Sequence, residues 1–351
     1  MKKTASQSRK RKIAAFDPEA PAVQNGNIFG LPFTAEESEV IVVPVPWEVT
    51  TSYGSGAENG PAAILEASAQ LDLYDEDFSD VWKRGIFMEP GSSDVIRDSR
   101  KYGKMAKKIM SHFANGGTGK SAEIKSLCKK VNSACADLNE WVRTHSKKWL
   151  SAGKSVIVLG GDHSVPFGLM QALGEIHPRY SMLHLDAHAD LREAYEGFEF
   201  SHASIQFNAL KLPQVEKWTA VGLRDYSQKE AAMIARHRGR MTAFTDRELK
   251  RREYRGVSFE KTCREILKTL SKKVYVSFDI DVLNPALCPH TGTPVPGGLE
   301  FEQVFYLLKR IVESGRKIIG CDLCEVAPGK NDEWDANVGM RALYRLCGLV
   351  S

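Results

Sequence analysis

The segment SMLHLDAHAD, at residues 181–190, places two carboxylates and an imidazole two residues apart, as Asp186, His188 and Asp190. The apolar residues before them predict a short buried strand, so these polar side chains would lie at its end. Two carboxylates held close together raise each other's pKa and cost free energy unless a positive charge lies between them. A bound cation would supply that charge. A solvated turn, in which an aspartate caps its own backbone, is the alternative, and this stretch alone does not separate the two.

The same kinds of side chain follow two other predicted strands. SVIVLG is followed by Asp162 and His163, and KVYVSF is followed by Asp279 and Asp281. If the three strand ends converge, four carboxylates besides Asp162 share one crevice with two imidazoles, and most of those carboxylates could not stay ionised without compensation. Two divalent cations, roughly 3.5–4 Å apart, would compensate them and activate a water between them. Ligation rich in oxygen favours Mn²⁺ over Zn²⁺, with Ni²⁺ or Co²⁺ as alternatives.

The chain alternates between apolar, strand-like runs and amphipathic helical segments. In FEQVFYLLKRIVESG, for example, Val304, Leu307, Leu308 and Ile311 fall on one helix face. Continuous apolar strands that alternate with helices indicate an α/β fold, in which helices cover both faces of a mainly parallel sheet to give a three-layer αβα sandwich. Ligands bind such sheets outside the carboxyl ends of the strands, where the candidate site would lie. The predicted strands span residues 40–45, 155–160, 181–185, 273–278 and 317–323.

The length of the chain limits the number of domains, and its net charge limits the kinds of binding partner. A chain of 351 residues allows one large domain or two smaller ones, and we find no internal linker or repeat. We therefore expect a single catalytic domain over residues 26–351, preceded by a disordered basic tail over residues 1–25. The tail sequence MKKTASQSRKRK has no apolar run after it, which predicts neither a signal peptide nor a membrane span. With a net charge of only +4, we expect no nucleic-acid or membrane partner.

The cysteines are scattered and odd in number. Cys321 and Cys324 have CxxC spacing, but no second pair completes a zinc site, so we expect both thiols to pack in the core. Free thiols are typical of a reducing compartment, which predicts a cytoplasmic protein.

Three motifs in this order, GGDHS, DAHAD and SFDIDVLNP with the later TGTPVPGGL, resemble the signature of the ureohydrolase family, which includes arginases, agmatinases and formimidoylglutamases. The segments SYGSGAENGPAAILEAS (52–68) and GCDLCEVAP (320–328) are also similar to that family, and the resemblance covers roughly residues 38–350. It implies the arginase/deacetylase-like fold, two Mn²⁺ ions per chain and a homo-oligomer, either a trimer or a hexamer. The implied reaction cleaves a linear C–N bond of a guanidino compound to give urea and an amine.

The resemblance also implies the metal ligands, residue by residue. One ion would be held by His163, Asp186, Asp190 and Asp279. The other would be held by Asp186, His188, Asp279 and Asp281, so that Asp186 and Asp279 bridge the two ions.

Other residues of these motifs receive roles that do not involve the metals directly. His202, in FSHAS, matches a proton-shuttling histidine of the family, and Asp190 would hold the proton of the attacking hydroxide. We expect Asp162, as the neighbour of a ligand, to orient the site or cap a helix, and His184 to be structural. Glu325 would either orient the site and contact substrate or cap a strand end.

Two departures from the family pattern concern the later motifs. Asn284 stands where an acid is usual, at a position that is not a metal ligand. Simple alignment of PGGLEFEQV puts Gln303 where the family has a glutamate that pairs with the substrate guanidinium. We therefore expect either that Glu302, one residue earlier, takes over this catalytic contact, or that Gln303 binds a different substrate.

Among guanidino substrates, the motifs look most like those of agmatinases, so agmatine is the favoured substrate. Formimidoylglutamase, guanidinobutyrase, arginase and guanidine hydrolase activities are the alternatives, and a metal-binding family member without catalysis is the alternative from another class. A substrate with an anionic tail would need a cation at the mouth of the site, for which Arg192 and Arg224 are candidates.

Overall fold

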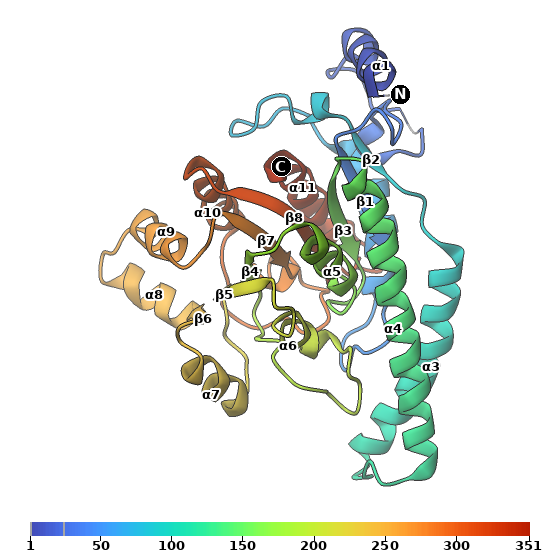
Figure 1. Cartoon of the computed structure of the whole chain (residues 1–351), viewed down its shortest axis with the longest axis vertical. Helices are drawn as coiled ribbons and strands as arrows, with labels where there is room; N and C mark the ends of the chain where they lie inside the picture. Colours follow the sequence, from blue (N-terminus) through green and yellow to red (C-terminus); the bar gives the residue numbers. More distant parts are fainter. Residues whose placement is uncertain (1, 24) are drawn as a thin grey trace.

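An eight-stranded, entirely parallel sheet forms the centre of the molecule (Figure 1). The computed structural model describes residues 2–23 and 25–351. In spatial order the strands are β2 (Ile86–Met88), β1 (Val40–Val45), β3 (Ser155–Gly160), β8 (Lys317–Leu323), β7 (Lys273–Phe278), β4 (Tyr180–Leu185), β5 (Val215–Val221) and β6 (Met241–Phe244). The predicted parallel sheet is confirmed. The pattern missed β2 and β6 because they have only three and four residues, and β5 because its first half carries charged side chains.

Helices cover both faces of the sheet, as the sequence predicts (Figure 1). The helices of the described residues are α1 (Lys2–Ala15), which lies beyond the sheet, α2 (Gly60–Ala67), α3 (Ser93–Ala114), α4 (Ala122–Ser151), α5 (Phe167–Ile176), α6 (Ile205–Ala209), α7 (Gln228–Arg236), α8 (Asp246–Tyr254), α9 (Phe259–Lys268), α10 (Phe301–Glu313) and α11 (Trp334–Leu349). None of these helices is long and apolar enough to cross a membrane.

Two apolar cores lie between the layers, and alternate residues of each strand point into one or the other. In β3, Ile157 and Leu159 pack in the core that contains α10 and α11, whereas Val156 and Val158 pack in the core that contains α4 and α5. The predicted apolar face of α10 is buried in the first of these cores. Strands buried on both faces explain why the sequence shows continuous apolar runs rather than alternation.

The outer edge of β2 is closed by one side chain. The Asn27 Oδ1 atom accepts the N–H of Met88 at 3.1 Å, and the Asn27 Nδ2 atom donates to the carbonyl of Ile86 at 3.1 Å. The amide thus satisfies one donor and one acceptor that a ninth strand would otherwise pair with.

The segment expected to be a disordered tail instead contains helix α1, which contacts the domain near the start of β1. Lys12 Nζ lies 2.7 Å from Glu37 Oε2, and Arg9 Nη2 lies 2.7 Å from Glu39 Oε1. The ring of Phe16, just after the helix, packs on a tryptophan ring 5.1 Å away. The basic residues of α1 have acidic partners far along the chain, which composition alone could not indicate.

The Lys12–Glu37 contact predicts a pH-dependent attachment of α1. Burial would raise the pKa of Glu37, but the hydrogen bonds from Lys12, Ser8 and the Thr34 N–H lower it to about 2, from a usual value of 4.5. Because the pKa is lowered in the folded state, the stabilisation is fully present above about pH 4.5 and is lost as the pH falls toward 2. We expect Lys12→Ala to speed proteolytic cleavage within α1 at pH 7. The difference from the wild-type protein should shrink below pH 4, and equal cleavage at pH 7 would contradict the prediction.

Candidate metal centre

The polar side chains that follow β3, β4 and β7 meet at the carboxyl edge of the sheet. The pairing of β4 with β7 continues one residue beyond the end of β7, because the Asp279 N–H donates to the Leu185 carbonyl at 2.9 Å. Asp186 and Asp279 therefore leave neighbouring strands side by side. His163 reaches the same point from the loop after β3.

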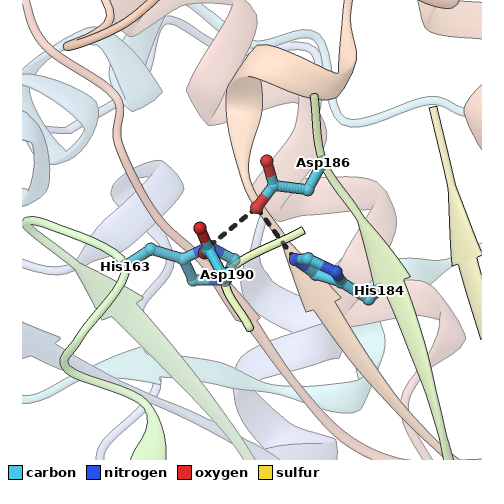
Figure 2. Close-up of side chains that lie close together, drawn as sticks. All are labelled: His163, His184, Asp186 and Asp190. Carbon is cyan, nitrogen blue, oxygen red and sulfur yellow. Dashed lines mark hydrogen bonds and ion pairs between the residues drawn. The ribbon is translucent and has the colours of Figure 1, made fainter. Parts of the chain in front are cut away.

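His163 faces three of the carboxylates. Its Nδ1 atom lies 3.0 Å from Asp186 Oδ2, 3.2 Å from Asp190 Oδ2 and 3.3 Å from Asp279 Oδ2. Figure 2 shows His163 and Asp190 approaching Asp186 from one side, with His184 on the other. The four residues expected to hold one ion thus lie together and are buried.

The second expected group adjoins the first. His188 Nδ1 lies 2.9 Å from Asp281 Oδ2 and 3.5 Å from Asp186 Oδ1. The Asp281 N–H donates to Asp279 Oδ1 at 2.9 Å. Asp186 and Asp279 therefore each contact members of both groups, which is the arrangement expected of bridging carboxylates.

The donor set fits divalent cations. Nitrogen and oxygen atoms of His163, His184, Asp186 and Asp190 all lie within 4.8 Å of one another, and so do those of Asp186, His188 and Asp281. Carboxylate oxygens with a minority of imidazole nitrogens suit Mn²⁺ and related ions. Within the described residues, no lysine or arginine nitrogen lies within 4 Å of the carboxylates of Asp186, Asp190, Asp279 and Asp281. The positively charged side chains that could balance them there are therefore imidazoles.

The electrostatics of the cluster follow from this crowding. Burial, together with Asp281 and Asp186, raises the pKa of Asp279 well above its usual range. Burial opposes a charged His163, but its hydrogen bonds to Asp186, Asp190 and Asp279 outweigh that effect and raise its pKa well above 6.5. Protons and divalent cations therefore compete for the same groups.

A buried hydrogen-bond network fixes the orientation of His163. Its Nε2 atom lies 2.9 Å from Ser277 Oγ and 3.5 Å from Asp322 Oδ1, and the Tyr275 hydroxyl donates to Asp322 Oδ2 at 2.5 Å. With Nε2 engaged in this way, Nδ1 is held toward the carboxylates. No motif of the sequence indicates these residues, although Tyr275 and Ser277 alternate along β7 on one face.

Two neighbours of the ligands also have defined contacts. Asp162 accepts the N–H groups of Ser164 and Val49, at 3.0 and 3.1 Å, and so ties the loop after β3 to the loop after β1. His184, expected to be structural, places Nε2 2.8 Å from Asp186 Oδ2. His184 thus holds the candidate ligand Asp186 by a hydrogen bond from within the strand that precedes it. Its position between apolar residues gives no sign of this contact in the sequence.

His202 lies at the mouth of the cluster, in a pocket of about 260 Å³ that it lines together with His188 and Asp190. Its backbone N–H donates to Thr50 Oγ1 at 3.1 Å, which anchors the residue. Burial lowers the pKa of His202, with Asp162 and Asp190 opposing that shift, which favours the neutral imidazole. This placement puts a titratable imidazole beside the candidate ligands.

Glu325 is a buried carboxylate with one free oxygen. Its Oε1 atom accepts the N–H of His163 at 2.8 Å. Its Oε2 atom is buried with no hydrogen-bond partner among the described residues, and it lies 3.4 Å from where a Cβ on Gly292 would be. Burial, with Asp279 and Asp162, raises its pKa well above 4.5. Its φ of +63° is unfavourable for a side chain larger than that of glycine, so the surrounding structure holds this carboxylate in place. Of the two roles left open for Glu325, the free oxygen favours substrate contact.

The structure does not bring Glu302 and Gln303 to this cluster, which corrects the expectation that one of them faces the substrate. The Glu302 side chain is 71% exposed and pairs with Arg345 of α11 at 2.9 Å. Gln303 Oε1 accepts the N–H of Glu300 at 3.0 Å, as part of the cap of α10. The helix itself is predicted by the sequence, but motif spacing could not reveal that its first-turn side chains pair with Arg345 and cap the helix.

The two candidate cations also differ in position. Arg224 donates to the carbonyls of Val295 and Asp281, at 3.0 and 2.7 Å, so its guanidinium is used in holding loops together. Arg192 lines the same pocket as His202, with its guanidinium 4.8 Å from the centre of the Tyr195 ring. Arg192 is therefore the arginine that a substrate could meet.

Comparison with known proteins agrees with this geometry. The family model described as "Arginase family" matches residues 38–348. An N(1)-aminopropylagmatine ureohydrolase of Thermus thermophilus is 33% identical over 317 residues, which cover 90% of this chain and 91% of the relative. An agmatinase of Bacillus anthracis is 28% identical over 293 residues, covering 84% and 85%. The crystal structure of an agmatine ureohydrolase of Thermoplasma volcanium superposes with a TM-score of 0.69 at 22% identity, covering 97% of this chain and 96% of that one.

Proposed function

This chain belongs to the arginase family and is a hydrolase of guanidino compounds, and on that premise we propose that it hydrolyses agmatine to urea and a free diamine. The observation that carries the proposal is the buried cluster of His163, Asp186, Asp190 and Asp279 with the free carboxylate oxygen of Glu325 beside it. Agmatine is favoured because relatives that match most of the chain are named as enzymes of agmatine or of its aminopropyl derivative.

Two Mn²⁺ ions would be held by the six residues His163, Asp186, His188, Asp190, Asp279 and Asp281. When bound, such a pair of cations supplies Lewis-acid polarisation and an activated water. The preference for manganese rests on the four carboxylates among six ligands. Assembly into a homo-oligomer and residence in the cytoplasm remain predictions.

The chain's own groups then have separate tasks. Burial raises the pKa of Glu325, but bound cations and the guanidinium itself would favour its ionised form. Its Oε2 atom would then accept a hydrogen bond from the guanidinium and hold it over the cluster, since a cation needs an anionic partner so close to bound metal ions. Asp190 would hold the proton of the attacking water at its carboxylate. His202 would carry a proton between the site and the leaving amine.

The test is a panel of substrates given to the Mn²⁺-loaded protein, with urea, formamide and ammonia measured as products. The panel contains agmatine, aminopropylagmatine, arginine, 4-guanidinobutanoate, formiminoglutamate and guanidine. We expect urea to be released fastest from agmatine or its aminopropyl derivative. Formamide from formiminoglutamate would contradict the proposal, and so would the absence of turnover on the whole panel, which would favour a metal-binding protein without catalysis.

One observation favours a second candidate substrate. Arg192 lies in the pocket, and within the described residues its guanidinium has no carboxylate within 4 Å. A carboxylate tail, as in 4-guanidinobutanoate, would find a partner there. A higher kcat/KM for 4-guanidinobutanoate than for agmatine would select this substrate.

His202 provides a prediction about proton transfer. Replacing His202 by alanine should leave the metal content unchanged, because the residue is not among the six ligands. Turnover should fall by roughly 10²–10⁴-fold, the usual contribution of a positioned acid or base. Metal analysis and initial rates on the same preparation separate these effects. Unchanged turnover would reduce His202 to a structural residue of the pocket.

A further inference from the structure

The loop over residues 191–200, which we call the mouth loop, is fastened to helix α4 through Asn132. The Asn132 Nδ2 atom donates to the Gly197 carbonyl at 3.0 Å, and its Oδ1 atom accepts the Glu199 N–H at 3.0 Å. One amide therefore holds the backbone on both sides of residue 198. Asn132 belongs to the long pair of helices α3 and α4 that extends past the sheet (Figure 1).

The surface of α4 is also shaped to receive this part of the loop closely. Gly197 has a φ of +87°, and a Cβ there would lie 3.0 Å from Cys128 Sγ, one turn before Asn132 on the helix. A side chain at this position would meet both a strained backbone and a tight contact. The loop is therefore docked by backbone fit as well as by hydrogen bonds.

The opposite side of the mouth loop contacts the candidate catalytic histidine. Tyr195 packs edge-to-face on His202, with ring centres 6.4 Å apart, and supports the guanidinium of Arg192 on its own face. Tyr195 and Phe198 exchange backbone hydrogen bonds of 3.2 and 2.9 Å. Tyr195 and Gly197 thus belong to one tight turn, so that a shift at Gly197 would move the Tyr195 ring.

We propose that Asn132 is a positioning residue, which acts through the mouth loop to fix Tyr195 and thereby the orientation of His202. The effect on turnover rests on the proposed function, whereas the docking of the loop does not. It follows that the α3–α4 pair does more than cover the sheet, because one of its side chains determines the shape of the mouth.

The experiment compares Asn132→Ala with Ser133→Ala, an exposed neighbour on the same helix. In Asn132→Ala we expect faster hydrogen exchange across residues 195–203 and an unchanged metal content. We also expect a kcat/KM on the best substrate that is lower by roughly ten- to a hundred-fold, the size of loss that a small misplacement can cause. The ring current of Tyr195 should displace the His202 Cε1–H resonance in the wild-type protein, and in Asn132→Ala this resonance should move toward its unperturbed position. Ser133→Ala should change none of these.

A second variant disturbs the contact between the mouth loop and α4 from the loop side. Gly197→Ala should reproduce the exchange and resonance changes, and the double variant should lose less than the sum of the two single effects, because both act on one docking contact. Unchanged exchange in Asn132→Ala, or faster exchange with an unmoved His202 resonance and unchanged kcat/KM, would overturn the proposal. If the wild-type protein hydrolyses no guanidino compound, exchange and the resonance still decide the positioning role, while the proposed function alone fails.

Discussion

Replacing Asp279 by alanine should remove both metal ions and all measurable hydrolysis. Asp279 contacts members of both groups of ligands, through His163 at 3.3 Å and the Asp281 N–H at 2.9 Å, so its loss affects two coordination spheres at once. Metal analysis of the purified protein should change from close to two ions per chain to none. Asp186→Ala should behave in the same way, because Asp186 also lies between the two groups.

Thermal unfolding gives an independent measure of this prediction. Burial and the neighbouring aspartates raise the pKa of Asp279, so its charged form is unfavourable in the folded protein without a cation. Without metal, Asp279→Ala should therefore unfold at the same or a higher temperature than the wild-type protein. Added Mn²⁺ should stabilise only the wild type, by about 2.7 kcal/mol at a concentration a hundred times its Kd.

Asp332→Ala is the matched control for Asp279→Ala. Asp332 is a half-exposed aspartate near His290 and contributes to none of the contacts among the six ligands. Its replacement should leave the two ions and the Mn²⁺-dependent stabilisation in place. If Asp279→Ala kept both ions and turnover, the assignment of this residue as a bridging ligand would be wrong.

Glu325→Gln should lower kcat/KM on agmatine by roughly one to two decades. The substitution keeps the size of the side chain and the hydrogen bond from the His163 N–H, but it removes the negative charge on the oxygen that has no partner. A charge-assisted hydrogen bond contributes about 1.5–3 kcal/mol, which sets the expected loss. The metal content should stay unchanged, since Glu325 is not among the six ligands.

Glu302→Gln is the control that distinguishes the two assignments of the guanidinium-binding residue, Glu325 from the structure and Glu302 from the motif alignment. Its side chain pairs with Arg345 on the surface, and surface ion pairs contribute little to stability. We expect kcat/KM to change by less than about twofold, within the range of surface substitutions. A large loss in Glu302→Gln with none in Glu325→Gln would reverse the assignment.

The place of the candidate ligands at one edge of the sheet could be predicted from the sequence because two regular patterns coincide there. Their assignment to two metal ions came from the resemblance to the ureohydrolases. Asp186 and Asp279 directly follow apolar strands, and the carboxyl ends of parallel strands meet at one edge. His163 follows from the same rule, with two residues of loop after Gly160. Positions fixed by strand periodicity are thus readable without coordinates.

Residues that act through tertiary contacts could not be found in this way. Nothing in the alternation of β4 shows that His184 turns toward Asp186, and nothing near Glu302 shows that it pairs with Arg345, 43 residues later. Glu325 stood at a recognisable strand end, but only the structure reveals that one oxygen is occupied and the other is free. The role of α1 was hidden for the same reason, since its partners lie in another part of the chain.

The amide of Asn27 at the margin of β2 has a consequence for how copies of this protein can meet. An incoming strand from a second molecule would need the Met88 N–H and the Ile86 carbonyl, and both are already engaged. Open-ended polymerisation by strand addition is therefore blocked on that side, even in a crowded solution where copies collide often. Copies that associate at this margin must therefore do so through side-chain contacts rather than by continuing the sheet.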